Sequence, residues 1–346
     1  MTQDHRPDVS PETTVADLGE RRLIARIQTQ TPAAPTWVHV AIGDDAAVVE
    51  PARNTLDVLT TDAMVEGVHF DRRLMTLGDV GHKLLAVSLS DLAAMGATPR
   101  TALLSLVLPG NTRVADLDAL VASLVALATT HHVALVGGNI ARSPGPLVAD
   151  VTATGAVRRR RVLRRDGVRP GDELYVSGHV GSAAAGLAWL QRTPDTATTP
   201  EPALSAAVDR FRRPEPRLRL GTLLGRNRAA SACIDLSDGL GAALHQLAEA
   251  SGVGFAIDGD VLPIDAGVAH WLASQQIDPV DLALSGGEDY ELAFTVARKR
   301  RGRLRHVRRL IGDLTITRIG EATTGPDVVV RRAGHAAPIP TGFVHF

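Results

Sequence analysis

Aspartates stand at several points of this chain where an apolar segment meets a turn. Asp44 and Asp45 are adjacent in AIGDDAAVV, Asp91 is the single acid in the mostly apolar stretch LAVSLSDLAAMGATP, and CIDLSDGL holds Asp235 and Asp238. Neighbouring carboxylates repel one another, and a carboxylate buried without a partner is costly, so such groups pair, bind a proton or hold a metal. Segment ends of this kind are also where α/β proteins place ligand-binding groups.

Hydroxyl groups accompany these acids, whereas thiols and imidazoles are scarce. LTTDAMVEGVHF supplies Thr60, Thr61 and Asp62 and, further on, His69, while LSGGEDYEL places Glu288 after two glycines. Hard oxygen ligands suit Mg²⁺ far better than Zn²⁺ or copper, and Mg²⁺ commonly bridges carboxylates to substrate phosphates. These segments therefore predict a magnesium-dependent protein that handles a phosphate substrate.

Each segment also has an ordinary structural interpretation. Asp44–Asp45 could cap a turn or a helix, the TTD triplet at 60–62 could end a strand, and Asp238 before Gly239 is a common turn pair. A lone His69 is more often a core residue than a ligand. Taken singly, these segments favour the structural interpretation, and for Asp91 function and helix capping are evenly balanced. Only their joint occurrence favours a site, and spacing alone does not show that the acids converge.

The usual nucleotide and nucleophile signatures are absent from the sequence. It contains no G-x-x-x-x-G-K-[ST], no kinase glycine loop with its HRD segment, and no G-x-S-x-G. The glycines of SGHVGSAAAG do not match the dinucleotide fingerprint. These motifs alone indicate a metal-dependent, phosphate-handling α/β protein and go no further.

Alternating helices and strands must position these residues. The run RRRRVLRRDGVRPGDEL changes the composition sharply, so we expect a loose tail at 1–16, a first domain at 17–157 and a second at 158–346, both mixed α/β. The hydrophobic patterns predict helices at 18–30, 79–97, 114–132 and 181–191, and a solvated basic helix at 299–309. Within the segment 55–65 we expect a strand that ends at the polar triplet 60–62. Further strands are predicted at 101–109, 133–139, 147–157, 173–178, 252–258 and 289–296.

The bulk composition excludes several classes of protein. The chain has 346 residues and a net charge of −1, so it has no general attraction for nucleic acid or anionic membrane. Its single cysteine, Cys233, excludes an internal disulfide and a multi-cysteine zinc site. The first residues have no apolar core typical of a secretory signal, and no apolar run reaches the roughly 18 to 20 residues of a membrane helix. We expect a cytoplasmic protein.

The ordered series of segments is more specific than any one of them. IGDDAAVV, TTDAMVEGVHF, HKLLAVSLSDLAAMGATP, VGGN, RRDGVRPGDELYVSG, IDLSDGL, LSGGEDYELAFTV and the terminal GFVHF together resemble thiamine-monophosphate kinase from about residue 18 to 346. SLSDLAAMGA and LSGGEDYEL are the strongest matches. That family is similar to aminoimidazole-ribotide synthetase, whose superfamily uses ATP without a P-loop.

The resemblance implies two mixed α/β (α+β) domains, the first forming a shared β-barrel in a homodimer. It implies a transferase that uses ATP and several Mg²⁺ to phosphorylate thiamine monophosphate to thiamine diphosphate, by direct in-line transfer. Two alternatives stay open: another ATP-using enzyme of the superfamily, or a weakened nucleotide or thiamine-phosphate binding protein. Selenophosphate synthetase would need a cysteine near the N-terminus, and the hydrogenase maturation enzyme would need one at the C-terminus, where this chain has Phe346.

Site residues follow from the same resemblance, position by position. No side chain would form a covalent intermediate, and Asp45, Asp91 and Asp235 would position the transfer. The implied metal ligands are Asp45, Thr60, Thr61, Asp62, Asp91, Asp235 and Asp238; the ATP contacts are Gly138, Asn139, Arg165 and Ser237; the thiamine-side contacts are His69, Glu288 and Phe343.

One position departs from the family pattern. After the two glycines of VGGN the family typically has aspartate, whereas this chain has Asn139. Asparagine offers a carbonyl oxygen without a charge, so Asn139 would be a weaker metal ligand. The expected consequence is a reduced activity or an altered magnesium requirement.

Overall fold

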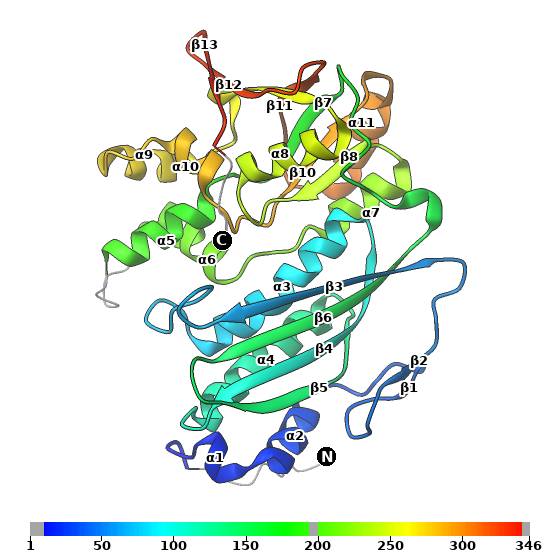
Figure 1. Cartoon of the computed structure of the whole chain (residues 1–346), viewed down its shortest axis with the longest axis vertical. Helices are drawn as coiled ribbons and strands as arrows, with labels where there is room; N and C mark the ends of the chain where they lie inside the picture. The colour runs from blue at the N-terminus through cyan, green and yellow to red at the C-terminus, as the bar shows by residue number, and fades with distance from the viewer. Residues whose placement is uncertain (1–9, 194–199, 341–346) are drawn as a thin grey trace. The chain divides into compact units, whose positions relative to one another are not determined.

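The computed structural model describes residues 10–193 and 200–340. Within them the chain forms two units, each with its own sheet and helices (Figure 1). The first unit comprises the described residues up to Ser88 together with Pro99–Ala156, and the second comprises Leu89–Thr98 and the described residues from Val157 on. The mixed α/β architecture predicted from the sequence is confirmed.

The first unit is built on a four-stranded sheet with helices on one face (Figure 1). The β4–β5 pair is parallel and is joined by α4, which is a right-handed crossover connection by the general rule for such units. A Cβ atom at Gly81 of α3 would lie 2.0 Å from the carbonyl oxygen of Leu120 in α4, so the two helices approach closely because Gly81 has no side chain. The strand order is β3 (Leu56–Val65), β6 (Val148–Val157), β4 (Thr98–Pro109), β5 (Ala134–Ser143), with α3 (Leu77–Ala94) and α4 (Val114–Thr130).

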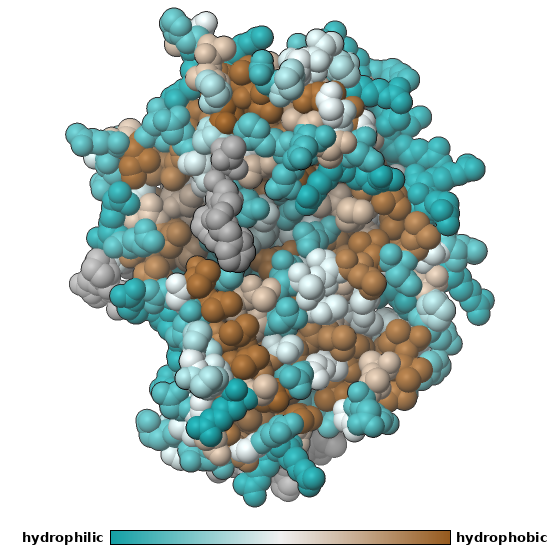
Figure 2. All heavy atoms as spheres, viewed as in Figure 1, coloured by the Kyte–Doolittle hydropathy of each residue, from teal (hydrophilic) through white to brown (hydrophobic). Residues whose placement is uncertain are grey.

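Strict alternation along β6 shows which face of this sheet is buried. Ala149, Val151 and Ala153 are buried, and the residues between them are half-buried. Because successive strand side chains point to opposite faces, one face packs on the helices and the other is more accessible. Leu59 of β3 is 71% exposed on that outer face, and Leu103 of β4 is also exposed. Figure 2 shows apolar side chains gathered over this part of the surface.

A short helical pair precedes the sheet. The sequence predicts one helix at 18–30, but Gly19, with φ 78°, separates α1 (Val15–Leu18) from α2 (Glu20–Gln30). Residues 13–15 belong to the fold rather than to a loose tail, since the Val15 N–H donates to the Thr112 carbonyl at 2.8 Å. The strands β1 (Val38–Val40) and β2 (Val48–Val49) then form an antiparallel pair that packs on the start of β5.

The second unit is built on a seven-stranded sheet. All its neighbours pair antiparallel except β12 and β9. The strand order is β13 (His335–Pro338), β12 (Val328–Arg332), β9 (Gly254–Asp258), β11 (Ile316–Thr323), β7 (Glu173–Ser177), β10 (Leu292–Val296), β8 (Ala232–Asp235). The helices are α5 (Ser182–Arg192), α6 (Pro202–Arg212), α7 (Leu218–Asn227), α8 (Leu240–Ser251), α9 (Ala266–Ser274), α10 (Pro279–Ser285) and α11 (Arg301–Ile311), with short 3₁₀ turns at Arg159–Arg161, Gly259–Val261 and Arg298–Arg300.

The central strands of this sheet are covered on both faces. Leu174 and Val176 of β7 share a core with Leu244 of α8, whereas Tyr175 between them stacks on Phe294 of β10, with ring centroids 5.8 Å apart. Every residue of β7 and β10 is accordingly buried. This explains why the apolar residues at the centre of each strand, Leu174–Val176 and Leu292–Phe294, do not alternate with charged ones.

Two predictions, one on a domain boundary and one on a helix surface, differ from the structure. Residues 89–98, placed in the first domain by the sequence, count with the second unit because the end of α3 packs there: the Leu163 N–H donates to the Met95 carbonyl at 3.1 Å. The predicted basic helix exists as α11, but it is not solvated all round, since Leu304 and Val307 are buried. Among the described residues, no helix is long and apolar enough to cross a membrane.

Candidate functional site

Asp44 and Asp45 lie in the loop between β1 and β2. Both are exposed, and the Asp45 N–H donates to the Asp44 carboxylate at 2.8 Å. The hairpin itself is held by Ala41 and Ala47, which pack on the start of β5. An exposed pair of carboxylates on an anchored loop can bind a cation without a large loss of solvation.

The TTD triplet lies inside β3, and this corrects the expectation that the strand ends there. β3 continues to Val65, so Thr60 and Asp62 point to one face of the sheet and Thr61 to the other. The Ser88 hydroxyl of α3 donates to Asp62 at 3.0 Å on the helix-covered face. On the outer face, the Thr61 hydroxyl donates to Asp150 of β6 at 3.2 Å. The side-chain oxygens of all three therefore do not share one face.

His69 closes a turn after β3. Its ring Nδ1 accepts a hydrogen bond from the Val65 N–H at 3.1 Å, and the main-chain N–H of His69 donates to the Val65 carbonyl at 2.9 Å. The first bond fixes Nδ1 as an acceptor, so a neutral ring carries its proton on Nε2. His69 is half-buried, and this bond orients its ring locally.

Gly138 and Asn139 lie in the middle of β5, not at its end. A Cβ atom at Gly138 would lie 1.8 Å from the Leu104 carbonyl oxygen of β4, so close strand pairing already requires glycine there. Asn139 is exposed. Its amide is therefore accessible to a ligand, whereas the glycine has a structural reason of its own.

In the second unit, Asp91 occupies the last turn of α3. The helix-capping interpretation of Asp91 is wrong, since α3 begins at Leu77. A carboxylate near a helix C-terminus is disfavoured by the helix dipole, so capping energetics do not explain its presence. Its neighbour Ser90 is fully buried, and the Ser90 hydroxyl donates to Asp235 at 2.7 Å.

Asp235 is the last residue of β8, where the strand turns toward α8. Its side chain is 4% exposed, so the hydrogen bond from Ser90 offsets part of the cost of burying the charge. Burial, with a smaller effect from Asp235, raises the pKa of Cys233 well above that of an ordinary thiol. Cys233 therefore stays protonated and is a core residue rather than a nucleophile.

The loop after β8 pairs with the loop before β10 and brings two predicted site residues together. The Glu288 N–H donates to the Ser237 carbonyl at 2.7 Å, and the Tyr290 N–H donates to the Leu236 carbonyl at 3.0 Å. A Cβ atom at Gly287 would lie 2.4 Å from the Ser237 carbonyl oxygen, which explains the second glycine of SGGEDYEL. Glu288 and Ser237 are both half-buried.

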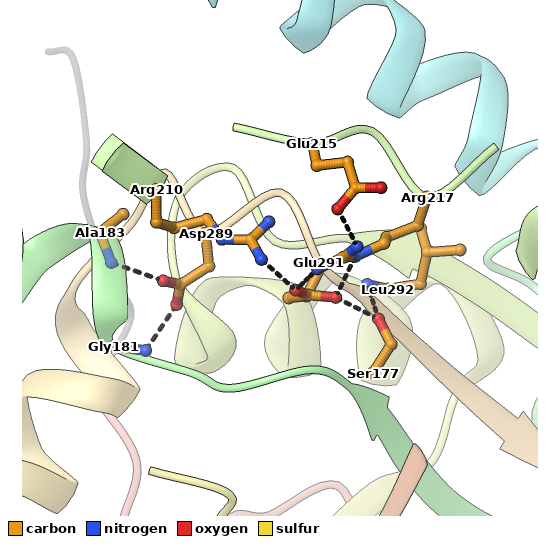
Figure 3. Close-up of polar contacts among 9 residues, drawn as sticks. All are labelled: Ser177, Gly181, Ala183, Arg210, Glu215, Arg217, Asp289, Glu291 and Leu292. Atoms are coloured by element: carbon orange, nitrogen blue, oxygen red, sulfur yellow. Dashed lines mark hydrogen bonds and ion pairs between the residues drawn. The ribbon is translucent and has the colours of Figure 1, made fainter. Parts of the chain in front are cut away.

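Two buried carboxylates, Asp289 and Glu291, follow Glu288 and belong to a framework that the sequence did not predict (Figure 3). Asp289 accepts hydrogen bonds from the N–H groups of Gly181, at 2.6 Å, and Ala183, at 2.9 Å, at the start of α5. Burial raises the pKa of Asp289 to about 7 even though these bonds lower it. Glu291, which is fully buried, accepts from the Arg217 Nε at 2.7 Å.

Further contacts complete the charge balance around Glu291. The Ser177 hydroxyl donates to its carboxylate at 2.6 Å, and an Arg210 guanidinium nitrogen lies 3.3 Å from it. Arg217 also pairs with Glu215, which lies two residues before it in the chain and is 71% exposed. Glu291 is thus the buried partner of two arginines, and spacing gives no signal for it because Arg217 lies far away along the chain.

The remaining predicted residues are placed separately. Arg165 is exposed, and its Nη1 donates to the Gln246 side chain of α8 at 2.7 Å. Asp238 is half-buried in the turn before α8. Phe343 lies outside the described residues. Sequence reasoning missed Ser88 and Ser90, although SLSD places both immediately before Asp91.

The donor set fits a hard divalent cation. The accessible candidates are carboxylate, hydroxyl and amide oxygens, with no thiolate among them, and this is the chemistry of Mg²⁺ rather than Zn²⁺. In the part of the chain that the structure describes, no three His, Cys, Asp or Glu side chains are gathered in an arrangement that could hold a metal ion. The fit therefore lies in the chemistry of the donors rather than in a preformed cluster of acids.

Comparisons with known proteins agree with this combination of fold and acidic segments. Residues 43–157 match the model of the AIR synthase related protein, N-terminal domain, and residues 169–332 match the C-terminal domain. The thiamine-monophosphate kinase of Salmonella typhimurium is 41% identical over 288 residues, which are 83% of this chain and 85% of that protein.

Solved structures give the same result. A thiamine-monophosphate kinase from Stenotrophomonas maltophilia superposes with a TM-score of 0.80 at 40% identity, covering 91% of this chain and 96% of that one. AaThiL, in a complex with AMPPCP and TMP, superposes with a TM-score of 0.72 at 33% identity, covering 91% and 94%. With both family models and nearly full-length relatives in agreement, the chain belongs to the thiamine-monophosphate kinase family of AIR synthase related proteins.

Proposed function

We propose that this chain transfers a phosphoryl group from ATP to thiamine monophosphate, giving thiamine diphosphate and ADP. The observation that carries the proposal is the structure of AaThiL with the ATP analogue AMPPCP and TMP, a chain 33% identical to this one over most of its length. A donor and an acceptor that are both phosphates require in-line positioning and charge neutralisation more than covalent help.

Magnesium ions would be held by carboxylates and hydroxyls of this chain. Bound there, they would offset the repulsion between two polyanions, which is about 4 kcal/mol for two unit charges 4 Å apart at an effective dielectric of 20. Thr61 would take part through its main-chain oxygen, since its hydroxyl donates to Asp150 on the outer face. The proposed ligands are Asp45, Thr60, Thr61, Asp62, Asp91, Asp235 and Asp238, with Asn139 through its amide oxygen.

The chain's own residues bind and orient the two substrates. Ser90 and Ser88 would hold the carboxylates of Asp235 and Asp62 in place through the hydrogen bonds that they donate. Direct transfer needs no covalent phospho-enzyme. ATP would contact Gly138, Asn139, Arg165 and Ser237.

Thiamine recognition would rest on three residues. Glu288 would accept hydrogen bonds from the aminopyrimidine, and the His69 ring would offer its Nε2 hydrogen, since its Nδ1 is already bonded. Phe343, which lies outside the described residues, would stack on the cationic thiazolium.

A homodimer formed through the first unit is part of the proposal. The outer face of its sheet carries the exposed Leu59 and Leu103, and Val48 on the adjoining hairpin is 51% exposed. Exposed apolar patches of this kind mark interaction surfaces, and a second copy of the chain would cover this one.

The proposal is tested by incubating the purified protein with ATP, Mg²⁺ and thiamine monophosphate and measuring ADP and thiamine diphosphate. We expect equal amounts of both products, no turnover with unphosphorylated thiamine, and no phosphate retained on the denatured protein. ADP release that does not need thiamine monophosphate would favour another reaction of the superfamily. Binding of thiamine monophosphate without formation of ADP would favour a binding protein. Phosphate retained on the denatured protein would refute direct transfer.

A further inference from the structure

The loop 286–291 holds its backbone in an unusual conformation. Glu288, with φ 69°, and Tyr290, with φ 49°, are both non-glycine residues in the left-handed region. Each such residue costs on the order of 1 kcal/mol or more and persists only where its surroundings enforce it. The loop is therefore held in place by its surroundings, and the residues that follow Glu288 make the contacts that hold it.

Asp289 fixes the loop to α5 directly after Glu288. Its carboxylate is 1% exposed and accepts from two backbone N–H groups, those of Gly181 and Ala183 (Figure 3). Two bonds to a helix start leave the Asp289 side chain one orientation. The main chain of Glu288 is then confined between this anchor and its own bond to Ser237.

Glu291 fixes the other end of the loop. Arg217 binds both of its carboxylate oxygens, and the Ser177 hydroxyl both donates to Glu291 and accepts the Leu292 N–H at 3.0 Å. These bonds restrict the conformation of the chain where the loop enters β10. The side chains of Asp289 and Glu291 are buried in the unit, whereas the Glu288 side chain just before them stays half-buried.

We propose that Asp289 and Glu291 are positioning residues that hold Glu288 in its left-handed conformation and so set the affinity for the thiamine-phosphate acceptor. The inference deepens the proposed function and rests on it, because it takes Glu288 as an acceptor contact. The anchors act through Glu288 and do not touch the substrate.

A purely architectural role is the competing explanation, and it makes a different prediction. If the anchors only stabilise the unit, their loss lowers stability but leaves the folded enzyme's affinity for each substrate unchanged. If they position Glu288, their loss raises KM for thiamine monophosphate alone, and only while Glu288 is present.

The experiment is a double-mutant cycle of Asp289→Asn and Glu288→Gln, in the full chain well below the melting temperature. Asparagine keeps one acceptor oxygen but turns an amide toward the second N–H. We expect Asp289→Asn to raise KM for thiamine monophosphate about 10-fold, with kcat and KM for ATP changing less than twofold. In the Glu288→Gln background the same change should alter KM less than twofold.

Asp265→Asn is the matched control, because Asp265 also accepts two N–H bonds at a helix start, from Gly267 and Val268. It should leave all kinetic constants unchanged. If Asp289→Asn fails to fold, Arg217→Lys tests the other anchor with the charge retained, and the same selective rise in KM is expected. Equal KM effects with and without Glu288, or an unchanged KM in the folded variant, overturn the inference.

The two proposals fail in distinguishable ways. Wild-type activity with no dependence of the Asp289 effect on Glu288 overturns the positioning role alone. A wild-type protein that neither phosphorylates thiamine monophosphate nor binds it in calorimetry overturns the proposed function, and the inference with it. Binding without turnover leaves the cycle measurable as dissociation constants for thiamine monophosphate.

Discussion

Two pairs of acidic residues, one pair in each unit of this chain, have opposite surroundings. In the first, Asp44 and Asp45 are exposed on a loop and bonded to each other only locally. In the second, Asp289 and Glu291 are almost wholly buried, and each is held by several donors. For these four acids, burial with fixed partners indicates framework and exposure on an anchored loop indicates a group that can bind an ion, whereas Asp235 is buried and bonded to Ser90 and is still a proposed ligand. The same residue type therefore needs its surroundings before a role is assigned.

The largest expected effect is on the buried framework. Glu291→Ala removes the buried partner of Arg217, which is 9% exposed, and leaves that charge facing the exposed Glu215. We expect the free energy of unfolding to fall by about 3–5 kcal/mol, measured by urea denaturation. Glu215→Ala is the matched control, since Glu215 pairs with the same arginine but is 71% exposed and should cost less than about 1 kcal/mol. Equal losses would remove the distinction between the two kinds of acid.

A pH dependence sharpens the same contrast. Burial raises the folded-state pKa of Asp289 from 3.8 to about 7, so the folded protein binds a proton that the unfolded chain has lost. Stability should therefore fall as the pH rises from about 4 to 7 and then level off, by up to on the order of 4 kcal/mol from this group. Unfolding curves across this range should show the slope in the wild type and a smaller slope in Asp289→Asn.

Asp278 is the control for that measurement. Burial raises the pKa of Asp278, but the hydrogen bonds from Arg332 and from the start of α10 lower it by more, so the net shift is downward. Its contribution to stability is present above the unfolded value of 3.8 and is lost only as the pH falls through the lower folded value. Asp278→Asn should leave the slope between pH 4 and 7 unchanged. An unaltered slope in Asp289→Asn would contradict the assignment to Asp289.

Exposed acids of the first unit should show the reverse pattern, in activity and not in stability. Asp45→Asn is expected to reduce kcat about 10²-fold and to raise the Mg²⁺ concentration for half-maximal rate, because a proposed metal ligand loses its charge. Its free energy of unfolding should stay within about 0.5 kcal/mol of the wild type. Asp57→Asn, an exposed acid of β3 outside the proposed set, should change neither. A lower free energy of unfolding for Asp45→Asn would instead indicate a structural role for Asp45.

The smallest effect is expected at Asn139. Asn139→Asp adds a carboxylate at an exposed position of β5 and should lower the half-saturating Mg²⁺ concentration a few-fold. Stability should not change. Magnesium titration of the steady-state rate is the measurement, and an unchanged titration curve would count against Asn139 as a metal ligand.

Local pattern predicted much of the fold and little of the framework. The apolar-rich segments at 114–132 and 173–178 correspond to α4 and β7, because hydrophobic pattern and segment length reflect burial. The glycine at position 19 was a visible signal for the break between α1 and α2. The triplet 60–62 was placed at a strand end because its polarity looked like a turn, although two-residue alternation would have allowed the strand to continue.

Long-range partners could not be predicted. Arg217 and Glu291 lie far apart in sequence, and only the folded unit places the residue before α7 beside the residue before β10. The same holds for Ser90 and Asp235. The candidate ligands were identified by residue type, whereas the residues that hold them depend on topology.

The start of α5 has a consequence for how phosphate recognition in this protein is understood. SGHVGSAAAG has the glycine-rich look of an anion loop, but the carboxylate of Asp289 already occupies the N–H groups of Gly181 and Ala183. A free phosphate would have to displace a carboxylate that belongs to the same chain. The glycine-rich pattern of this segment therefore does not indicate an anion site, and inorganic phosphate or sulfate should not bind there.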